Sequence, residues 1–293
     1  MTTWQLHLLN SRNALTSVMS EIRASLRETL AKVANHAEVP NFDLVVRADT
    51  RIADWGLRAT TPGPGIIEIA INPARWSEEY FQRTLVRELH HLIRWERPGY
   101  GRSLGEALVS EGLAGHFVTQ VLGGQSDPWD AMRPSSGVAR QALNEWARRD
   151  FDHARWFLGK GDLRRWSGFG IGHRLIAEHL SQIEDQDVVS LSWAPADQFR
   201  AAMRRLVAAD TGEEDIEDLP EEEIAGEPAS DSDPAPADAQ SELNLASEAP
   251  ADVAEDSQGE DLASATTASE SIGLAKSDAD TLDSGAKEPP PSV

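Results

Sequence analysis

The charge of this chain is divided unevenly between its two ends, and this division limits which part can fold. The chain has 293 residues and a formal net charge of −22. From Asp210 onward, 25 Asp and Glu stand against two Lys, and there is no Phe, Trp or Tyr. Such a segment cannot bury enough apolar surface to offset the entropy lost on ordering. We therefore predict one folded domain over residues 1–209 and a disordered acidic tail over residues 210–293.

Composition excludes several classes of function. The part before the tail holds 24 acidic and 25 basic residues, whereas a nucleic-acid-binding domain needs a basic surface, so we expect no nucleic-acid partner. The chain has no Cys, which rules out disulfides and thiolate metal sites. Its start does not resemble a signal peptide and no apolar run approaches 18 residues, so we expect a cytoplasmic protein without a membrane partner. The tail could bind a basic partner.

The pattern of apolar residues predicts an α+β fold. Residues 13–36 have apolar side chains at spacings of three and four, as in an amphipathic helix. Residues 42–49 and 65–73 are β-branched runs typical of strands, and "TTPGPG" before the second predicts a turn. From Trp76 onward the pattern is helical, and the predicted helices are 76–97, 103–122, 137–150, 152–158, 170–183 and 195–208. Short strands with one amphipathic helix should therefore precede a helical bundle.

The helix predicted over 76–97 contains "RELHH", which differs from the zinc-peptidase pattern H-E-x-x-H at one position. Most of this helix is apolar around its circumference, so its ionisable residues should be buried and need partners or a metal. In H-E-x-x-H, two His one turn apart bind zinc and the Glu activates the metal-bound water. Glu88 and His91 match the Glu and the second His, but Arg87 stands at the first His.

The next helix, over 103–122, carries a carboxylate in an apolar stripe. Leu104, Leu108, Gly115 and Val118 follow one another at helical spacing, and Glu111 lies in the middle of this stripe. A buried carboxylate needs a cation, which could be a metal or the guanidinium of Arg87. Both possibilities follow from the sequence.

Together these segments resemble a known family. "RELHHLIRWERPGYGRSLGEALVSEGLAGHF" (87–117) is similar to the bacterial family of predicted zinc-dependent proteases of unknown function, in which H-E-x-H-H precedes E-A-L-x-x-E-G-L-A. The resemblance runs from the first helix to about residue 208. It implies a zincin-like fold and a gluzincin-like site, with His91 and Glu111 as zinc ligands and Glu88 as general base. The first ligand does not carry over, because Arg87 is a permanent cation.

The resemblance implies a zinc-dependent metallopeptidase that hydrolyses peptide or protein substrates through a zinc-bound water activated by Glu88. For that function a ligand from outside the motif has to replace position 87, and the candidates are His116, His173 and His179. A weakly bound zinc on His91 and Glu111, without hydrolysis, is a further possibility. So is an outward-pointing Arg87.

The alternative is a degenerate pseudopeptidase. Here the fork of Arg87 bridges Glu111 and Glu88 in place of the metal, and the domain serves as a binding or interaction module. A structure distinguishes the two, since an Arg87 fork within hydrogen-bond reach of Glu111 favours the pseudopeptidase, and a third His near His91 favours the enzyme.

Two further features follow from analogy with gluzincins. His173, at the start of the helix in "GFGIGHRLIAEHL", could act in catalysis by polarising the oxyanion, although a packing role is the commoner one for such a residue. The strand over 66–71 could be the edge strand that holds a peptide by main-chain pairing.

Overall fold

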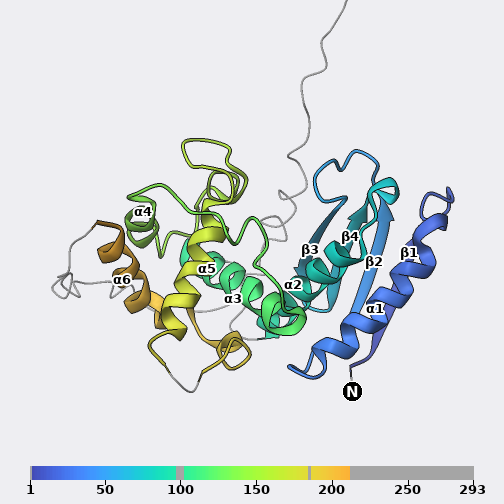
Figure 1. Cartoon of the computed structure of the whole chain (residues 1–293), viewed down its shortest axis with the longest axis horizontal. Helices are drawn as coiled ribbons and strands as arrows, with labels where there is room; N and C mark the ends of the chain where they lie inside the picture. Colours follow the sequence, from blue (N-terminus) through green and yellow to red (C-terminus); the bar gives the residue numbers. More distant parts are fainter. Residues whose placement is uncertain (1, 97–101, 184–185, 212–293) are drawn as a thin grey trace, which may run out of the picture. The chain divides into compact units, whose positions relative to one another are not determined.

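The computed structural model describes residues 2–96, 102–183 and 186–211. The predicted α+β class is confirmed, with a small sheet followed by helices (Figure 1). The strands are β1 (Trp4–Leu9), β2 (Phe42–Ala48), β3 (Leu57–Gly63) and β4 (Ile66–Ile71). The helices are α1 (Met19–Val33), α2 (Glu78–Glu96), α3 (Leu104–Leu122), α4 (Val138–Asn144), α5 (Ser167–Leu180) and α6 (Arg200–Thr211). The shorter helical segments are η1 (Thr16–Val18), η2 (Pro73–Arg75), η3 (Ala154–Leu158), η4 (Ser190–Trp193) and η5 (Ala196–Phe199).

The sheet has the order β1-β2-β4-β3 and one well-covered face. The pairs β1–β2 and β2–β4 are parallel, whereas β3–β4 is antiparallel. Along β2, Phe42, Leu44 and Val46 are buried while Asp43 and Arg47 are exposed, which is the period-two pattern of a sheet with one buried face. Helices α1 and α2 lie side by side in front of the strands (Figure 1).

Strand β3 corrects two expectations. The turn predicted over "TTPGPG" is shorter than expected and consists of Pro64 and Gly65, because β3 continues through Thr60 and Thr61 to Gly63. The strand over 66–71 is β4, which pairs on both sides, so the edge strand at this end of the sheet is β3 instead. Pro62 misled the prediction. A proline lacks the N–H that an inner strand needs but is tolerated on an edge, where the pairing with β4 also shifts register between Thr60 and Gly63.

Strand β1 was not predicted at all. Its six residues pair in register with β2, from Trp4 with Phe42 to Leu9 with Arg47. It alternates between half-buried and exposed positions, the signature of a short outer strand. The connection from β1 to β2 passes through α1, as expected for two parallel neighbours.

Helices α2 and α3 match the predicted ranges closely, and both are buried over most of their length. Helix α2 packs against β3 and α1 on one side and against α3 on the other. This arrangement carries Arg87, Glu88 and His91 into the interior between the sheet and the helices.

Helices α3 and α5 approach each other at glycines. A Cβ on Gly112 would lie 2.2 Å from the carbonyl oxygen of Gly172, and a Cβ on Gly172 would lie 2.3 Å from that of Leu108. The missing side chain of Gly112 therefore lets the backbone of α5 come close. Gly115 instead makes room for a side chain, because a Cβ there would lie 2.6 Å from a carboxylate oxygen of Asp130.

The remaining helices differ from the predictions mainly at their ends. The predicted helix over 13–36 is η1 followed by α1, and the one over 137–150 shortens to α4. The last helix, α6, continues to Thr211, so Asp210 belongs to it and forms an ion pair of 2.8 Å with Arg174. Residues 212–293, the rest of the predicted tail, lie outside the described residues. Among the residues that are described, no helix has the length and apolar character needed to cross a membrane.

Candidate functional site

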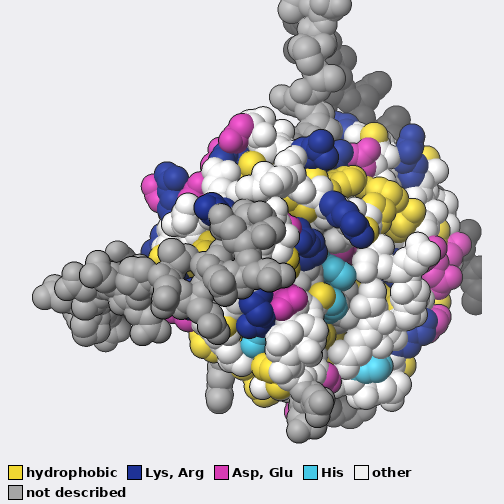
Figure 2. All heavy atoms as spheres, turned by 60° about the vertical axis from the view of Figure 1, so that its left-hand side comes forward, with side chains coloured by type: hydrophobic (Ala, Val, Ile, Leu, Met, Phe, Trp, Pro, Cys, Tyr) yellow, Lys and Arg dark blue, Asp and Glu magenta, His cyan; other side chains and the backbone are white. Residues whose placement is uncertain are grey.

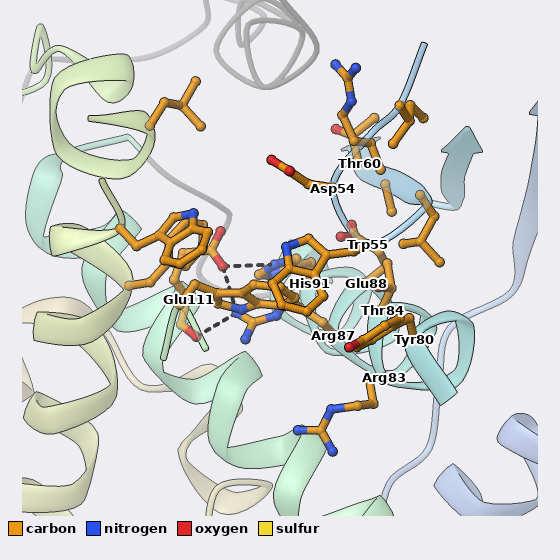
Figure 3. A pocket seen from close by; sticks show the side chains of 18 of the residues that line it. Asp54, Trp55, Thr60, Tyr80, Arg83, Thr84, Arg87, Glu88, His91 and Glu111 are labelled. Atoms are coloured by element: carbon orange, nitrogen blue, oxygen red, sulfur yellow. Dashed lines mark hydrogen bonds and ion pairs between the residues drawn. The ribbon is translucent and has the colours of Figure 1, made fainter. Parts of the chain in front are cut away.

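Arg87, His91 and Glu111 meet at one oxygen atom. Arg87 and His91 lie one turn apart on α2, and Glu111 faces them from α3 (Figure 3). The Oε2 of Glu111 is 3.1 Å from Nη1 of Arg87 and 3.6 Å from Nε2 of His91. All three side chains are buried. The guanidinium thus contacts the same carboxylate oxygen that faces the imidazole.

Arg87 has two more acidic neighbours that the sequence did not reveal. Its Nη2 donates a hydrogen bond to Oδ2 of Asp130 and lies 3.7 Å from Oδ2 of Asp127. Asp127 in turn accepts a hydrogen bond of 2.5 Å from Nε of Arg83. The expected bridge from Arg87 to Glu88 is wrong, because Asp130 takes that place.

The charge of Arg87 is held in place by these acids and by aromatic rings. Burial would lower the pKa of Arg87, but Asp130, Glu111 and Asp127 outweigh it and raise that pKa. Burial raises the pKa of Asp130 to about 7, against the lowering effect of Arg87. The guanidinium carbon also lies 5.6 Å from the ring centre of Trp129 and 5.8 Å from that of Phe169, within the range of cation–π attraction.

Glu88 points to the sheet instead. Its Oε2 accepts a hydrogen bond of 2.7 Å from the hydroxyl of Thr61 on β3. The side chain is buried, and burial raises its pKa, against the lowering effects of His91 and of the Thr61 hydrogen bond. Glu88 therefore links α2 to the edge strand.

These residues line a pocket of about 240 Å³. Arg87, Glu88, His91 and Glu111 contribute to its inner wall, and residues of β3 and of the preceding loop form one side (Figure 3). Aromatic side chains make up much of the rest, namely Trp55, Tyr80, Trp129, Trp166 and Phe169. The space-filling view shows histidine side chains beside basic and acidic ones on one face of the molecule (Figure 2). Among the described residues that line the pocket, His91 is the one histidine.

The other predicted histidines lie elsewhere. His173 stacks on His116 with ring centres 3.9 Å apart, and its Nε2 lies 3.2 Å from the hydroxyl of Ser126. His179 packs on Phe199 at 4.5 Å. None of these three histidines lines the pocket. The geometry brings Glu88, His91 and Glu111 together and leaves His173 with His116, so the catalytic role of His173 stays a prediction.

His90, next to His91 in sequence, faces away from the pocket. Its Nε2 lies 3.2 Å from the hydroxyl of Ser192, and its ring packs 5.3 Å from that of Phe117. This agrees with the angle of about 100° between adjacent helical positions. Position 90 therefore supports the packing of η4 on α2.

Comparison with known proteins identifies the family. A family model described as "Predicted Zn-dependent protease (DUF2268)" matches residues 19–201. The chain belongs to this family. No curated protein and no solved structure matches it significantly.

The match covers the region from the start of α1 to the first two residues of α6, including both helices of the site. It confirms the resemblance expected from the E-A-L-V-S-E-G-L-A segment. The description of the family implies zinc, whereas Arg87 stands at the first His of the H-E-x-x-H pattern in this chain.

The side chains of this DUF2268 member do not fit a zinc ion. A catalytic zinc takes three protein ligands with lone pairs, whereas a guanidinium has none and repels a cation. Nη1 of Arg87 lies in contact with Glu111, one of the two remaining ligand candidates. Within residues 2–96, 102–183 and 186–211, no group of three or more His, Cys, Asp or Glu side chains is arranged to hold a metal.

Proposed function

We propose that this DUF2268 protein is a peptidase homologue in which Arg87 replaces the metal, and that it binds an extended peptide segment without hydrolysing it through zinc. The observation that carries the proposal is the contact of 3.1 Å between Nη1 of Arg87 and the Glu111 oxygen that faces His91. The family suggests zinc-dependent proteolysis, and this contact is what argues against it in this chain.

The charges around Arg87 support a structural role for its cation. A buried carboxylate cluster is stable only when it is neutralised. Arg87 contacts Glu111 and Asp130 directly, and Arg83 contacts Asp127. These two guanidinium groups provide the positive charge that a divalent metal ion would otherwise supply.

The edge of β3 supports peptide binding. No strand in the described part of the chain pairs with the outer edge of β3, and residues Leu57 to Thr61 line the pocket. An extended peptide can add to such an edge through main-chain hydrogen bonds. The carbonyl of Thr61 already accepts a hydrogen bond of 3.2 Å from Nε1 of Trp95, so a bound peptide has to pair with the part of β3 that precedes Thr61.

Metal content of the purified full chain tests the proposal. We expect wild type, after incubation with zinc and dialysis, to retain far less than one zinc per chain by elemental mass spectrometry. Arg87→His restores the first ligand of the family pattern and should retain close to one. Arg87→Gln, which removes the cation without adding an imidazole, is the matched control and should retain none.

Two additions make the result decisive. The single change Arg87→His leaves the buried carboxylate of Asp130 without its guanidinium partner, which can impair folding. The double variant Arg87→His with Asp130→Asn removes this carboxylate as well, so a folding defect of the single variant can be recognised and avoided. Glu111→Gln in the Arg87→His background should abolish zinc retention. The proposal is wrong if wild type itself holds close to one zinc per chain and Glu111→Gln releases it.

A further inference from the structure

The aromatic pocket beside β3 has the features of a recognition site for one side chain. Typical pockets for whole small-molecule ligands have volumes of about 300–1,000 Å³. The present pocket, at about 240 Å³, is smaller. It suits a single large side chain better than a complete ligand.

The rings of the pocket support one another. Trp55 lies edge-to-face against Tyr80 at 5.0 Å and against Trp129 at 5.8 Å, and Trp129 lies in the same way against Trp166 at 6.4 Å. Edge-to-face contacts at such distances are favourable for aromatic pairs. The wall is therefore formed by rings from several separate segments that hold one another in position.

Two of these rings stand on strained backbone. Only three described non-glycine residues have positive φ, and two of them are Trp55 (φ 53°) and Trp166 (φ 71°). Bulky side chains rarely adopt this region, and such strain concentrates at functional and ligand-binding positions. Both tryptophans line the pocket. Their neighbours Asp54 and Arg165 form an ion pair of 3.0 Å that joins the two loops.

The charged groups of the pocket already have partners. Arg165 is paired with Asp54, Arg83 with Asp127, and Arg87 with Glu111 and Asp130. Glu88 accepts the hydrogen bond from Thr61. An incoming acidic or basic side chain would lose its hydration and meet both signs of charge at once. The wall chemistry thus favours an uncharged occupant.

We propose that this pocket receives one large uncharged side chain, best an aromatic one, from an extended peptide segment paired with β3. Trp55 and Trp166 are the specificity-determining residues. The inference rests on the proposed peptide binding and adds to it the class of side chain that is recognised.

The test uses five peptides and the full chain. The probes are fluorescein-labelled, amidated heptapeptides of sequence Ser-Val-Ser-X-Ser-Val-Ser, with Phe, Leu, Ala, Lys or Glu at X, followed by fluorescence anisotropy. We expect the Phe peptide to bind about tenfold more tightly than the Ala peptide, or better, because a buried ring removes a large apolar area from water. The Leu peptide should be intermediate, and the Lys and Glu peptides should bind no better than Ala.

Variants at the two strained positions give a sharp control. Trp55→Gly and Trp166→Gly remove each ring while glycine accepts the positive φ, so the backbone is retained. Each should reduce the affinity for the Phe peptide to that for the Ala peptide. Trp193→Ala removes a tryptophan that is 56% exposed and outside the pocket, and it should change nothing.

The outcomes separate the two proposals. If all five peptides bind equally, or if the Lys or Glu peptide binds best, the pocket assignment is wrong while peptide binding stands. If none binds, both fall. Mass spectrometry of the recovered peptides shows whether any is cleaved, and zinc-dependent cleavage would contradict the proposed function while the preference at X remains measurable.

Discussion

At the scale of single residues, the most informative side chain is Arg87, which is buried among acids at the position of the first His in the H-E-x-x-H pattern. It is only 6% exposed. A cation so far from water persists only with close counter-charges. Two of those counter-charges come from α3 and from the segment after it, Glu111 and Asp130, so the fold holds the guanidinium from two sides.

Asp130→Asn tests this dependence. The change leaves Arg87 with one direct carboxylate instead of two, and we expect the free energy of unfolding to fall by about 2 kcal/mol or more. Urea denaturation followed by tryptophan fluorescence measures it. Asp43→Asn is the matched control, because Asp43 forms an exposed contact with His7, and such pairs contribute about 0–1 kcal/mol. Equal effects of the two changes would disprove the importance of Asp130.

Part of this cluster was predictable from the sequence. Helical periodicity places Glu111 in the apolar stripe of its helix. A carboxylate buried there needs a cation, and Arg87 was one of the two cations considered. Asp127 and Asp130 were missed because they lie in a segment without regular period, where inward and outward positions alternate irregularly. The sequence feature that could have indicated them is the presence of two acidic residues, one on either side of Pro128 and Trp129, in a segment between apolar helices.

At the scale of elements, the site depends on how closely α3 approaches α5. The glycines at positions 112 and 172 bring the two backbones into contact. Since Glu111 is the neighbour of Gly112, the same contact sets where the carboxylate stands relative to α2. Phe169 of α5, which faces Arg87, is positioned by it too.

Gly112→Ala should therefore disturb both stability and the pocket. The added Cβ would lie 2.2 Å from the backbone of Gly172, and overpacking against rigid backbone costs about 1–3 kcal/mol or more. Gly63→Ala is the control, since a Cβ there meets nothing within 4 Å. Thermal unfolding by circular dichroism should show a clear decrease for the first variant and little change for the second. An unaltered melting temperature for Gly112→Ala would contradict the close approach.

At the scale of the whole molecule, the order of strands before helices predicted the fold class from sequence, whereas the sheet topology was beyond such reasoning. Four strands in the order β1-β2-β4-β3 require knowledge of which edges pair. Strand β1 is too short for its alternation of apolar and polar residues to identify a strand, and Pro62 within β3 made that segment look like a turn. Strong helical periods, by contrast, located α2 and α3 to within two residues of their ends.

The folded part should lose stability in acid through His173. Burial, then His116 and Arg87, lower the pKa of His173 to about 3, against about 6.5 in an unfolded chain. Between these values the unfolded chain binds a proton that the folded protein does not, so stability falls as pH decreases from about 6.5 towards 3. The effect is at most roughly 1.4 kcal/mol per pH unit, and partial exposure reduces it.

His173→Gln should lose less stability on acidification than the wild-type protein does. The comparison is the difference in free energy of unfolding between pH 7 and pH 4.5, measured by urea denaturation for wild type and variant. His36→Gln, which changes an exposed histidine in the turn after α1, should leave the wild-type difference unaltered. If His173→Gln behaves like His36→Gln, the burial of a neutral His173 does not contribute to acid sensitivity.

The outer edge of β3 has a consequence for solubility. An open strand edge is a template on which a second copy of the same chain can polymerise. Here Pro62 offers no N–H, and the Thr61 carbonyl is occupied by the indole of Trp95. Only a short part of the β3 edge can therefore form main-chain hydrogen bonds. This part is long enough for a flexible peptide, but it is too short to pair with a whole strand of a neighbouring molecule. The features that shorten the binding edge thus also act as a guard against aggregation.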